Sequence, residues 1–168
     1  VTDAKYRKYV KGKDYLKAFE EALKDADEGS KVLYIPAGTF ELSGIWYIFG
    51  SDVKITGAGM WYTNLKFTNP NPFGGGISGG NGSHGPDGYC NNVEICNLYL
   101  NSNLRSRHNQ QAVYKCFMDV FKGRSVIHHV WEDHFECGFW IGDYNGKVDY
   151  SNDLKIISCR IRNNFADG

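Results

Sequence analysis

The sequence predicts an all-β protein that winds as a parallel β-helix, a solenoid of stacked coils, behind one N-terminal α-helix. Short apolar and β-branched runs recur in the C-terminal half without helices between them. Aligned on Val93, Val126 and Leu154, they repeat after 33 residues from 93 to 126 and 28 residues from 126 to 154. Periods of this size indicate a solenoid. The runs occupy residues 92–101, 125–143 and 153–168.

Composition limits the class of partner. The chain has 168 residues, enough for a domain with its own core, and its 19 basic and 19 acidic residues cancel. No net field therefore attracts it to nucleic acid or to a membrane surface, and no apolar run approaches the roughly 18 residues that cross a bilayer. Aromatic residues make up 15% of the chain, which favours a neutral polymer such as a glucan. No signal segment stands at Val1, so any secretion signal is removed or lies outside the chain.

The first element is an amphipathic helix over residues 14–28. Its apolar stripe includes Phe19 and Leu23, with charged residues opposite. Asp14 is the expected N-cap, and Gly29 stands where a glycine commonly follows a helix. An amphipathic helix before the first coil can cover the open apolar end of a β-stack, so we interpret it as a cap.

Strands are expected next, at residues 31–42, 45–49, 53–59 and 64–68. Pro36 ends the first run, and Gly57 and Gly59 allow tight corners. The helix followed by Val-Leu-Tyr-Ile-Pro-Ala-Gly-Thr-Phe at 32–40 resembles the opening of pectin-lyase-like right-handed β-helices. The resemblance implies the right-handed fold and says little about the reaction.

Two segments interrupt the strand pattern. Residues 69–87 are rich in Gly, Pro, Asn and Ser, which predicts a long mobile loop. This loop lacks the Lys-Ser/Thr of a phosphate-binding loop. Residues 102–123 form a second insert, with Arg105 and His108 among its polar residues. This insert is interpreted either as a wall of a substrate groove or as a loop packed on the flank of a coil.

The five cysteines show no metal-binding spacing. Cys96, Cys137 and Cys159 lie in apolar runs and are expected to be buried free thiols. Cys90 and Cys116 lie in loop-like sequence, where one disulfide is an open alternative. An odd count excludes complete pairing.

Candidate catalytic residues come from the last third. Equivalent positions on successive coils lie about 4.8 Å apart, so Asp143 and Asp167, 24 residues apart from 143 to 167, would approach each other. Carboxyl groups held about 6.5 to 9.5 Å apart suit an inverting glycosidase, and their repulsion would separate an acid from a base. The alternative is that both are ordinary turn residues beside glycine.

Residues 126–143 together with Ile-Arg-Asn-Asn-Phe-Ala-Asp-Gly at 161–168 resemble the catalytic module of glycoside hydrolase family 87, the α-1,3-glucanases and mycodextranases. The resemblance implies a secreted right-handed β-helix that hydrolyses internal α-1,3-glucosidic bonds with inversion and without a cofactor. Asp143 and Asp167 match two aspartates of that family. The family has a further Asp one coil beyond, so we expect a β-helix truncated after Gly168, inactive alone, whose partner is its own continuation.

Other residues near these aspartates are candidates for substrate binding. His134 would orient an acid or bind a hydroxyl, and Asp133 would support the site from behind. Of Trp131 and Trp140, one is expected in the core and the other, Trp140, against a sugar ring. Of His128 and His129, one is expected to point inward with a hydrogen bond. No metal site is expected, because no third ligand has suitable spacing.

Two alternative functions stay open. A polysaccharide lyase or epimerase on the same fold would need basic residues or calcium for uronic acids, and Arg160 and Arg162 are the nearest basic pair. The other is a non-catalytic carbohydrate-binding β-helix. The residues do not decide between α-1,3 and mixed α-1,3 and α-1,4 linkages.

Overall fold

The structure, a computed structural model, describes residues 2–69, 74–80, 90–106, 114–142 and 151–166, and within these ranges it is mostly β-structure. The elements in chain order are α1 (Ala4–Arg7), α2 (Leu16–Glu28), β1 (Val32–Ile35), β2 (Gly38–Leu42), β3 (Trp46–Tyr47), β4 (Lys54–Gly57), β5 (Thr63–Phe67), β6 (Ile77–Ser78), β7 (Cys90–Asn91), β8 (Glu94–Ser102), β9 (Lys115–Asp119), β10 (Phe121–Lys122), β11 (Val126–Asp133), β12 (Cys137–Ile141), β13 (Lys155–Ile157) and β14 (Arg160–Arg162).

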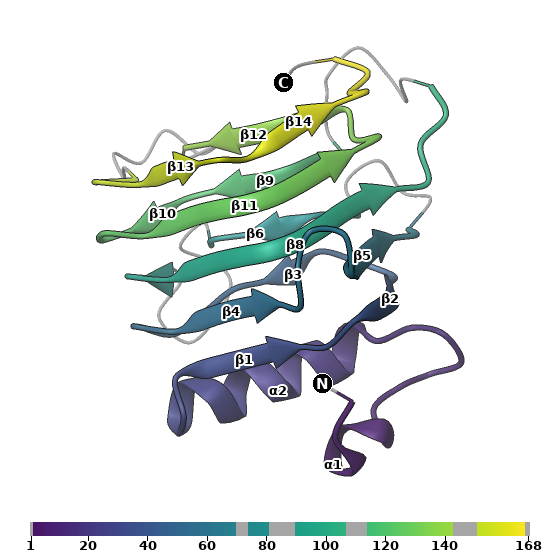
Figure 1. The fold of residues 1–168 in the computed structure, drawn as a ribbon, viewed down its shortest axis with the longest axis vertical. Coiled ribbons are helices and arrows are strands. Elements are labelled where there is room, and N and C mark those ends of the chain that lie inside the picture. The colour runs from purple at the N-terminus through teal and green to yellow at the C-terminus, as the bar shows by residue number, and fades with distance from the viewer. Residues whose placement is uncertain (1, 70–73, 81–89, 107–113, 143–150, 167–168) are drawn as a thin grey trace.

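The described strands form three sheets, and all pairings between named strands are parallel. The largest sheet has the order β1-β4-β8-β11-β13, with β2, β5 and β14 joined to it, and the second has the order β12-β9-β6-β3. The third contains β7 and β10. Figure 1 shows the strands as tiers above α2, with the front and back sheets running in opposite directions. The prediction of a β-rich chain with parallel sheets is confirmed.

The register differs by one residue from the predicted alignment. Val126 pairs with Glu94 on one side and with Lys155 on the other, so the repeats are 32 residues from 94 to 126 and 29 from 126 to 155. The place next to Val93 belongs to Ser125, whose buried hydroxyl accepts a hydrogen bond from the Val93 N–H at 3.1 Å and donates one to a backbone carbonyl. These hydrogen bonds of a small polar side chain at the corner form in the observed register.

The core is built from rows of side chains that stack from tier to tier. One row contains Leu33, Ile55, Ile95 and Ile127, which pair in register and are at most 4% exposed. Ile156 continues the row on the uppermost described strand and is 43% exposed. Alternate side chains point outward, which gives β5 its alternating burial pattern.

Bends also stack from tier to tier. Asn97, His129 and Ser158 occupy equivalent positions, bracketed by the pairs of β8 with β11 and of β11 with β13 and β14. Their φ values are 60°, 50° and 52°, a left-handed conformation that is uncommon outside glycine and favours Asn and His among other residues. The largest sheet therefore bends at the same place on three neighbouring tiers.

Helix α2 covers the lowest tier beneath β1 (Figure 1). Phe19 is fully buried, and its ring contacts those of Phe40 and Trp46 with centroids 5.7 and 5.0 Å apart. The helix begins two residues later than expected, although the Asp14 carboxylate still accepts a hydrogen bond from the Leu16 N–H at 3.0 Å.

Gly29 follows the helix directly, but it does not adopt the left-handed conformation that is common for a glycine at this position. Gly29 has φ −128°, and it is Lys31 that adopts φ 58°. The Lys31 N–H donates to the Ala26 carbonyl at 2.7 Å, which closes the end of the helix two residues further on. No helix in the described part of the chain is long and apolar enough to cross a membrane.

The prediction that residues 69–87 form an unpacked mobile loop is wrong for the central part that the structure describes, residues 74–80. Residues 74–80 are buried and contain β6, a strand of the second sheet. A Cβ on Gly76 would lie 1.9 Å from the Lys115 carbonyl oxygen, and one on Gly75 would lie 2.2 Å from the Tyr114 ring. These glycines have a packing role, because they let β6 approach β9 closely. The rest of the segment lies mainly outside the described residues.

The insert 102–123 is likewise part of the stack in its second half, residues 114–123. Its second half supplies β9 and β10, and Tyr114, Cys116 and Phe117 are buried. The interpretation of this half as a wall or flank loop is therefore wrong. Residues 107–113, which include His108, lie outside the described residues.

All five cysteines are free, which excludes the disulfide left open for Cys90 and Cys116. Both of these residues lie on strands and are buried, so the loop-like interpretation of their surroundings is wrong. Cys96 and Cys137 are buried as expected, whereas Cys159 is only partly buried.

Candidate functional site

A polar corner lies where the upper strands of the largest sheet end. Asp133 closes β11 and pairs with Arg162, which closes β14 on the next tier. The residues that follow, His134 and Asn163, both turn the chain with left-handed φ values of 61° and 53°. Parallel pairing therefore brings Asp133, His134, Arg162 and Asn163 together although 29 residues separate 133 from 162.

Asp133 is the centre of this corner. Its side chain is 3% exposed, and its Oδ2 accepts hydrogen bonds from Arg162 Nε and Nη2 at 3.1 and 2.9 Å. Oδ1 lies 2.8 Å from His134 Nδ1 and accepts a hydrogen bond from Asn163 Nδ2 at 2.9 Å. Such partners offset the loss of hydration that a buried carboxyl group suffers. Asp133 thus contacts the side chains of His134, Arg162 and Asn163, and its Oδ2 also accepts a hydrogen bond from the Tyr99 hydroxyl at 3.4 Å.

His134 faces an open cleft of about 440 Å³ that is also lined by Arg105, Asn163, Asn164 and Phe165. Its side chain is 35% exposed, and its backbone carbonyl accepts a hydrogen bond from the Ser102 hydroxyl. Because Nδ1 is engaged by Asp133, the other ring nitrogen remains for a ligand hydroxyl. Arginine, amide and imidazole groups beside an aromatic ring form the kind of surface that binds a sugar.

Glu132 points the other way, into the core beneath the cleft. It is 1% exposed, and Oε1 accepts a hydrogen bond from Asn164 Nδ2 at 2.8 Å, while Oε2 has no partner among the described residues. Burial raises the pKa of Glu132 to about 7, the Asn164 bond acts against this rise, and the nearby Asp133 carboxylate adds to it. The same Asn164 side chain accepts a hydrogen bond from the Phe135 N–H at 3.1 Å. Asn164 thus links the floor of the cleft to this buried carboxyl group.

The two tryptophans differ in exposure as expected, but Trp131 is covered on the outer side of β11 and is not part of the core cluster. Trp131 is 9% exposed, with the guanidinium groups of Arg160 and Arg162 over its ring at 4.7 and 4.3 Å. Trp140 on β12 is 40% exposed, and Lys115 Nζ lies 4.6 Å from its ring centroid. Trp140 therefore offers an aromatic surface, but it does not line the cleft of His134 as described.

The proposed catalytic residues Asp143 and Asp167 lie outside the described residues, so only the residues before them are placed. The Gly142 N–H donates to the Asp119 carbonyl at 3.0 Å, beyond the end of β12. The Ala166 N–H donates to the Glu136 carbonyl at 2.8 Å, just before the start of β12. Ala166 is therefore fixed next to the polar corner, and Gly142 lies at the other end of β12.

Sequence reasoning missed Asn163 and Asn164 as cleft residues, whereas Arg105 belongs to the insert that was interpreted as a possible groove wall. The run Arg162-Asn163-Asn164 had carried the family resemblance, and each of its side chains bonds to the tier below. A polar run directly after a strand was the available signal. The expectation that one of His128 and His129 points inward is wrong: His128 is partly buried on the outer side of β11 and His129 is exposed.

One further group of described residues could hold a metal ion. Glu94, Cys96 and His128 offer ligand atoms that all lie within 4.8 Å of one another. They belong to β8 and β11 and lie near the start of β11, whereas the cleft lies at its end. The expectation of no third ligand is thus wrong, because the ligands come from two tiers that are adjacent only in space.

Comparison with known proteins places this geometry in a family. Residues 8–168 match the model of the α-1,3-glucanase catalytic domain D2. The solved Agl-KA catalytic domain is 47% identical with a TM-score of 0.79, over 91% of this chain and 26% of that one.

A catalytic domain of a glycoside hydrolase family 87 α-1,3-glucanase, solved in complex with nigerose, is 25% identical with a TM-score of 0.64, over 95% of this chain and 25% of that one. An aspartate-to-alanine variant of such a domain with nigerose gives 25% identity and a TM-score of 0.66, again over 95% of this chain and 25% of that one. No curated protein sequence matches the chain. The chain spans about a quarter of the length of the solved chains that it matches.

Proposed function

The chain belongs to the family of α-1,3-glucanase catalytic domains, and on this premise we propose that it is part of a secreted, endo-acting glycoside hydrolase that cleaves α-1,3-glucosidic bonds. The observation that carries the proposal is the match of residues 8–168 to that family. The polar cleft at His134 is consistent with a neutral oligosaccharide ligand, because it combines hydrogen-bonding groups with an aromatic ring. The family match favours hydrolysis over a lyase, an epimerase or a purely binding protein.

We propose that the stack is a right-handed parallel β-helix. Parallel strands that are joined by crossovers are right-handed in nearly all proteins, and every named pairing here is parallel. We also propose that further coils pack above β13 and β14. Ile156 and Ile161, which continue two inward rows, are 43% and 39% exposed, and such side chains gain most from being covered.

The proposed chemistry is inversion by two carboxyl groups, with Asp167 as one of them. Inverting enzymes hold the two groups about 6.5 to 9.5 Å apart, with water between one of them and the sugar. Asp167 directly follows Ala166, which is fixed beside the corner that carries His134. His134 and Asn163, held by Asp133, would bind sugar hydroxyls, and Trp140 would stack on a sugar ring further along the chain of the polymer.

Asp143 is the second candidate carboxylate, and the described residues set a condition on it. Ala166 bonds at the start of β12 and Gly142 follows its end, so about five residues of strand, on the order of 16 Å, separate the two. Pairing of Asp143 with Asp167 requires the chain after Gly142 to return over this distance. Otherwise the partner of Asp167 is the further aspartate that the resemblance places one coil beyond Gly168.

Substitution in the full-length protein tests these assignments. Asp167→Asn should lower the rate of release of reducing ends from α-1,3-glucan by about 100- to 10,000-fold while glucan binding persists. Asp143→Asn should cause a similar loss only if it supplies the second carboxylate. Asp149→Asn, from the same polar linker as Asp143, is the control and should keep its rate.

The stereochemistry provides an independent readout. NMR of the first product formed should show the anomer opposite to that of the substrate bond. Full activity of Asp167→Asn would refute its catalytic role, and retention of the α-anomer would refute the inverting mechanism. Binding of glucan by the unmodified protein without release of reducing ends would refute the proposed hydrolase.

A further inference from the structure

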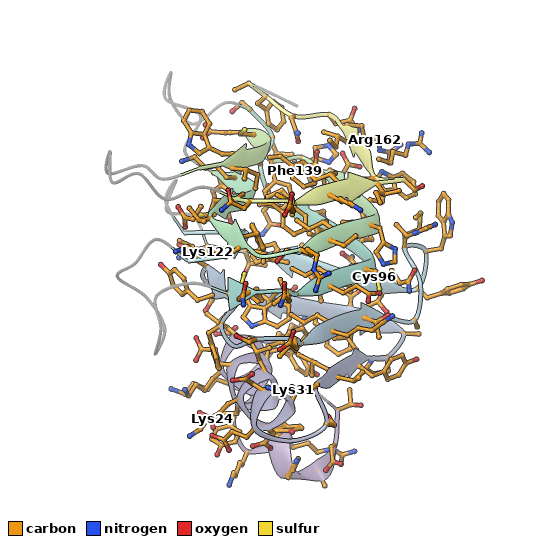
Figure 2. All side chains as sticks on the ribbon, turned by 90° about the vertical axis from the view of Figure 1, so that its left-hand side faces the viewer. Lys24, Lys31, Cys96, Lys122, Phe139 and Arg162 are labelled. Atoms are coloured by element: carbon orange, nitrogen blue, oxygen red, sulfur yellow. The ribbon has the colours of Figure 1, made fainter. Side chains whose placement is uncertain are left out.

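We propose that Glu94, Cys96 and His128 form a binding site for a transition-metal ion of the zinc type on the outer wall of the largest sheet. The site is distinct from the proposed glucan cleft. His128 lies near the start of β11, whereas His134 follows its last residue, so the two sites lie at opposite ends of the strand. Figure 2 shows Cys96 on the same wall of the stack as Arg162, and β8 of Cys96 lies two tiers below β14 of Arg162.

Two of the three pairs of ligand atoms have nearly the spacing of a tetrahedral site, and all three atoms lie within 4.8 Å of one another. Zinc lies about 2.3 Å from sulfur and about 2.0 to 2.2 Å from nitrogen and oxygen, so tetrahedral angles separate sulfur from oxygen by about 3.6 Å and nitrogen from oxygen by about 3.3 Å. In the structure Cys96 Sγ lies 3.6 Å from Glu94 Oε1, and His128 Nε2 lies 3.0 Å from the same oxygen. Small side-chain movements would bring all three atoms into contact with one ion.

The chemical nature of the three ligands selects the class of ion. A thiolate with an imidazole and a carboxylate is a ligand set of zinc and cobalt, whereas magnesium and calcium prefer oxygen alone. Burial raises the pKa of the Cys96 thiol, the Thr56 hydroxyl bond acts against this rise, and the Glu94 carboxylate adds to it. A bound divalent ion would reverse the balance, because coordination deprotonates a thiol.

Neighbouring side chains hold the ligands from behind. His128 would bind the ion through Nε2, because its Nδ1 lies 2.8 Å from His129 Nδ1 and so is occupied by that ring. Asn97 Nδ2 donates hydrogen bonds to Cys96 Sγ at 3.5 Å and to Thr56 Oγ1 at 3.2 Å. Partners of this kind orient ligands in known metal sites. Three protein ligands leave the fourth position of the ion to water.

Lys54 competes with the ion. Its Nζ lies 2.6 Å from Glu94 Oε1, and its ammonium group already compensates the charge of that carboxylate. Lys54 is 43% exposed at its side chain, so it can turn into solvent when a divalent ion arrives. Removal of this lysine should therefore strengthen metal binding. If the cluster were only an ion-pair network, the substitution would leave metal binding unaffected.

Cobalt(II) titration of the full-length protein tests the site, because a cobalt–thiolate bond gives a charge-transfer absorption band in the near ultraviolet. We expect one equivalent of cobalt to produce this band and zinc to abolish it by displacement. Cys96→Ser should remove the band and lower cobalt affinity by at least about 100-fold. Cys159→Ser is the matched control, since this half-buried thiol two tiers above Cys96 contacts only backbone carbonyls among its described bonds.

A second variant, which keeps all three ligands, tests the site if Cys96→Ser does not fold. Lys54→Met should increase cobalt affinity about tenfold, since it removes a competing positive charge. Zinc should also raise the Tm of the wild type and of Cys159→Ser by a few degrees, and leave that of Cys96→Ser unchanged. Absence of the band in the wild type, its persistence in Cys96→Ser, or unchanged affinity in Lys54→Met would each overturn the proposal.

Discussion

The buried carboxyl group of Glu132 makes the stability of the protein depend on pH in a direction that substitution can test. Glu132 is 1% exposed and points into the core, and burial raises its pKa from 4.5 to about 7. In the unfolded chain the group loses its proton near pH 4.5, so between about pH 4.5 and 7 the folded state binds more protons. The folded state is therefore favoured at low pH, and this advantage is lost as the pH rises through 7.

The size of the effect follows from the same two pKa values. Each pH unit between them corresponds to 1.36 kcal/mol, so the free energy of unfolding should fall by about 3 kcal/mol between pH 4.5 and 7.5 from this group alone. Glu132→Gln removes the ionisation and keeps an oxygen that can accept the hydrogen bond from Asn164. The variant should match the wild type near pH 4.5 and exceed its stability by about 3 kcal/mol at pH 8.

Urea unfolding of both proteins at pH 4.5, 6 and 8 measures this difference. Glu41→Gln, which removes a carboxylate beside Lys66 on the outer side of the same sheet, is the control. A stability difference between Glu132→Gln and the wild type that does not change with pH would refute the reasoning. An equal pH trend in Glu41→Gln would show that loss of any carboxylate produces it.

Three further predictions concern packing and the cleft. Gly76→Ala should destabilise the protein by at least about 3 kcal/mol in urea unfolding, because φ is 99° and the new Cβ would lie 1.9 Å from a carbonyl oxygen of β9. Gly12→Ala is the control: its φ is 64° with open space around the new Cβ, so it should cost only about 1 kcal/mol. Arg162→Met should cost about 2 kcal/mol by leaving the buried Asp133 carboxylate without its main cation, and an unchanged Tm would contradict this. Trp140→Ala should weaken α-1,3-glucan binding about tenfold in a pull-down assay without lowering Tm, and unaltered binding would exclude a stacking role.

Much of the fold could be predicted because its signals are local. The apolar stripe with Phe19 and Leu23 indicated α2, and the alternating runs indicated strands, since both depend on the period of side chains along one segment. The polar corner at Asp133 and His134 was also found, because it follows directly after an apolar strand. The lower exposure of Trp131 has another cause than the alternation expected, since Trp61 and the guanidinium groups of Arg160 and Arg162 cover its ring.

Composition misled where packing was decisive. A run of glycines without apolar side chains indicates a loop, yet Gly75 and Gly76 belong to a buried strand segment because a neighbouring ring and carbonyl leave no room for a Cβ. The inward orientation of Glu132 likewise contradicts the general rule for charged residues. Neither the space beside a glycine nor the partner of a buried carboxyl group can be inferred from one segment alone.

The sequence by itself determined that this chain forms parallel-stacked strands above an amphipathic helix. Only the tertiary structure decided which residues meet across tiers. Glu94, Cys96 and His128 come together, and Arg162 reaches Asp133, because parallel pairing places residues about 30 positions apart side by side. The physical reason is register: a shift of one residue turns every side chain of a strand to the other face, so the apolar rows of the core and the buried Ser125 hydrogen bond are compatible with one alignment only.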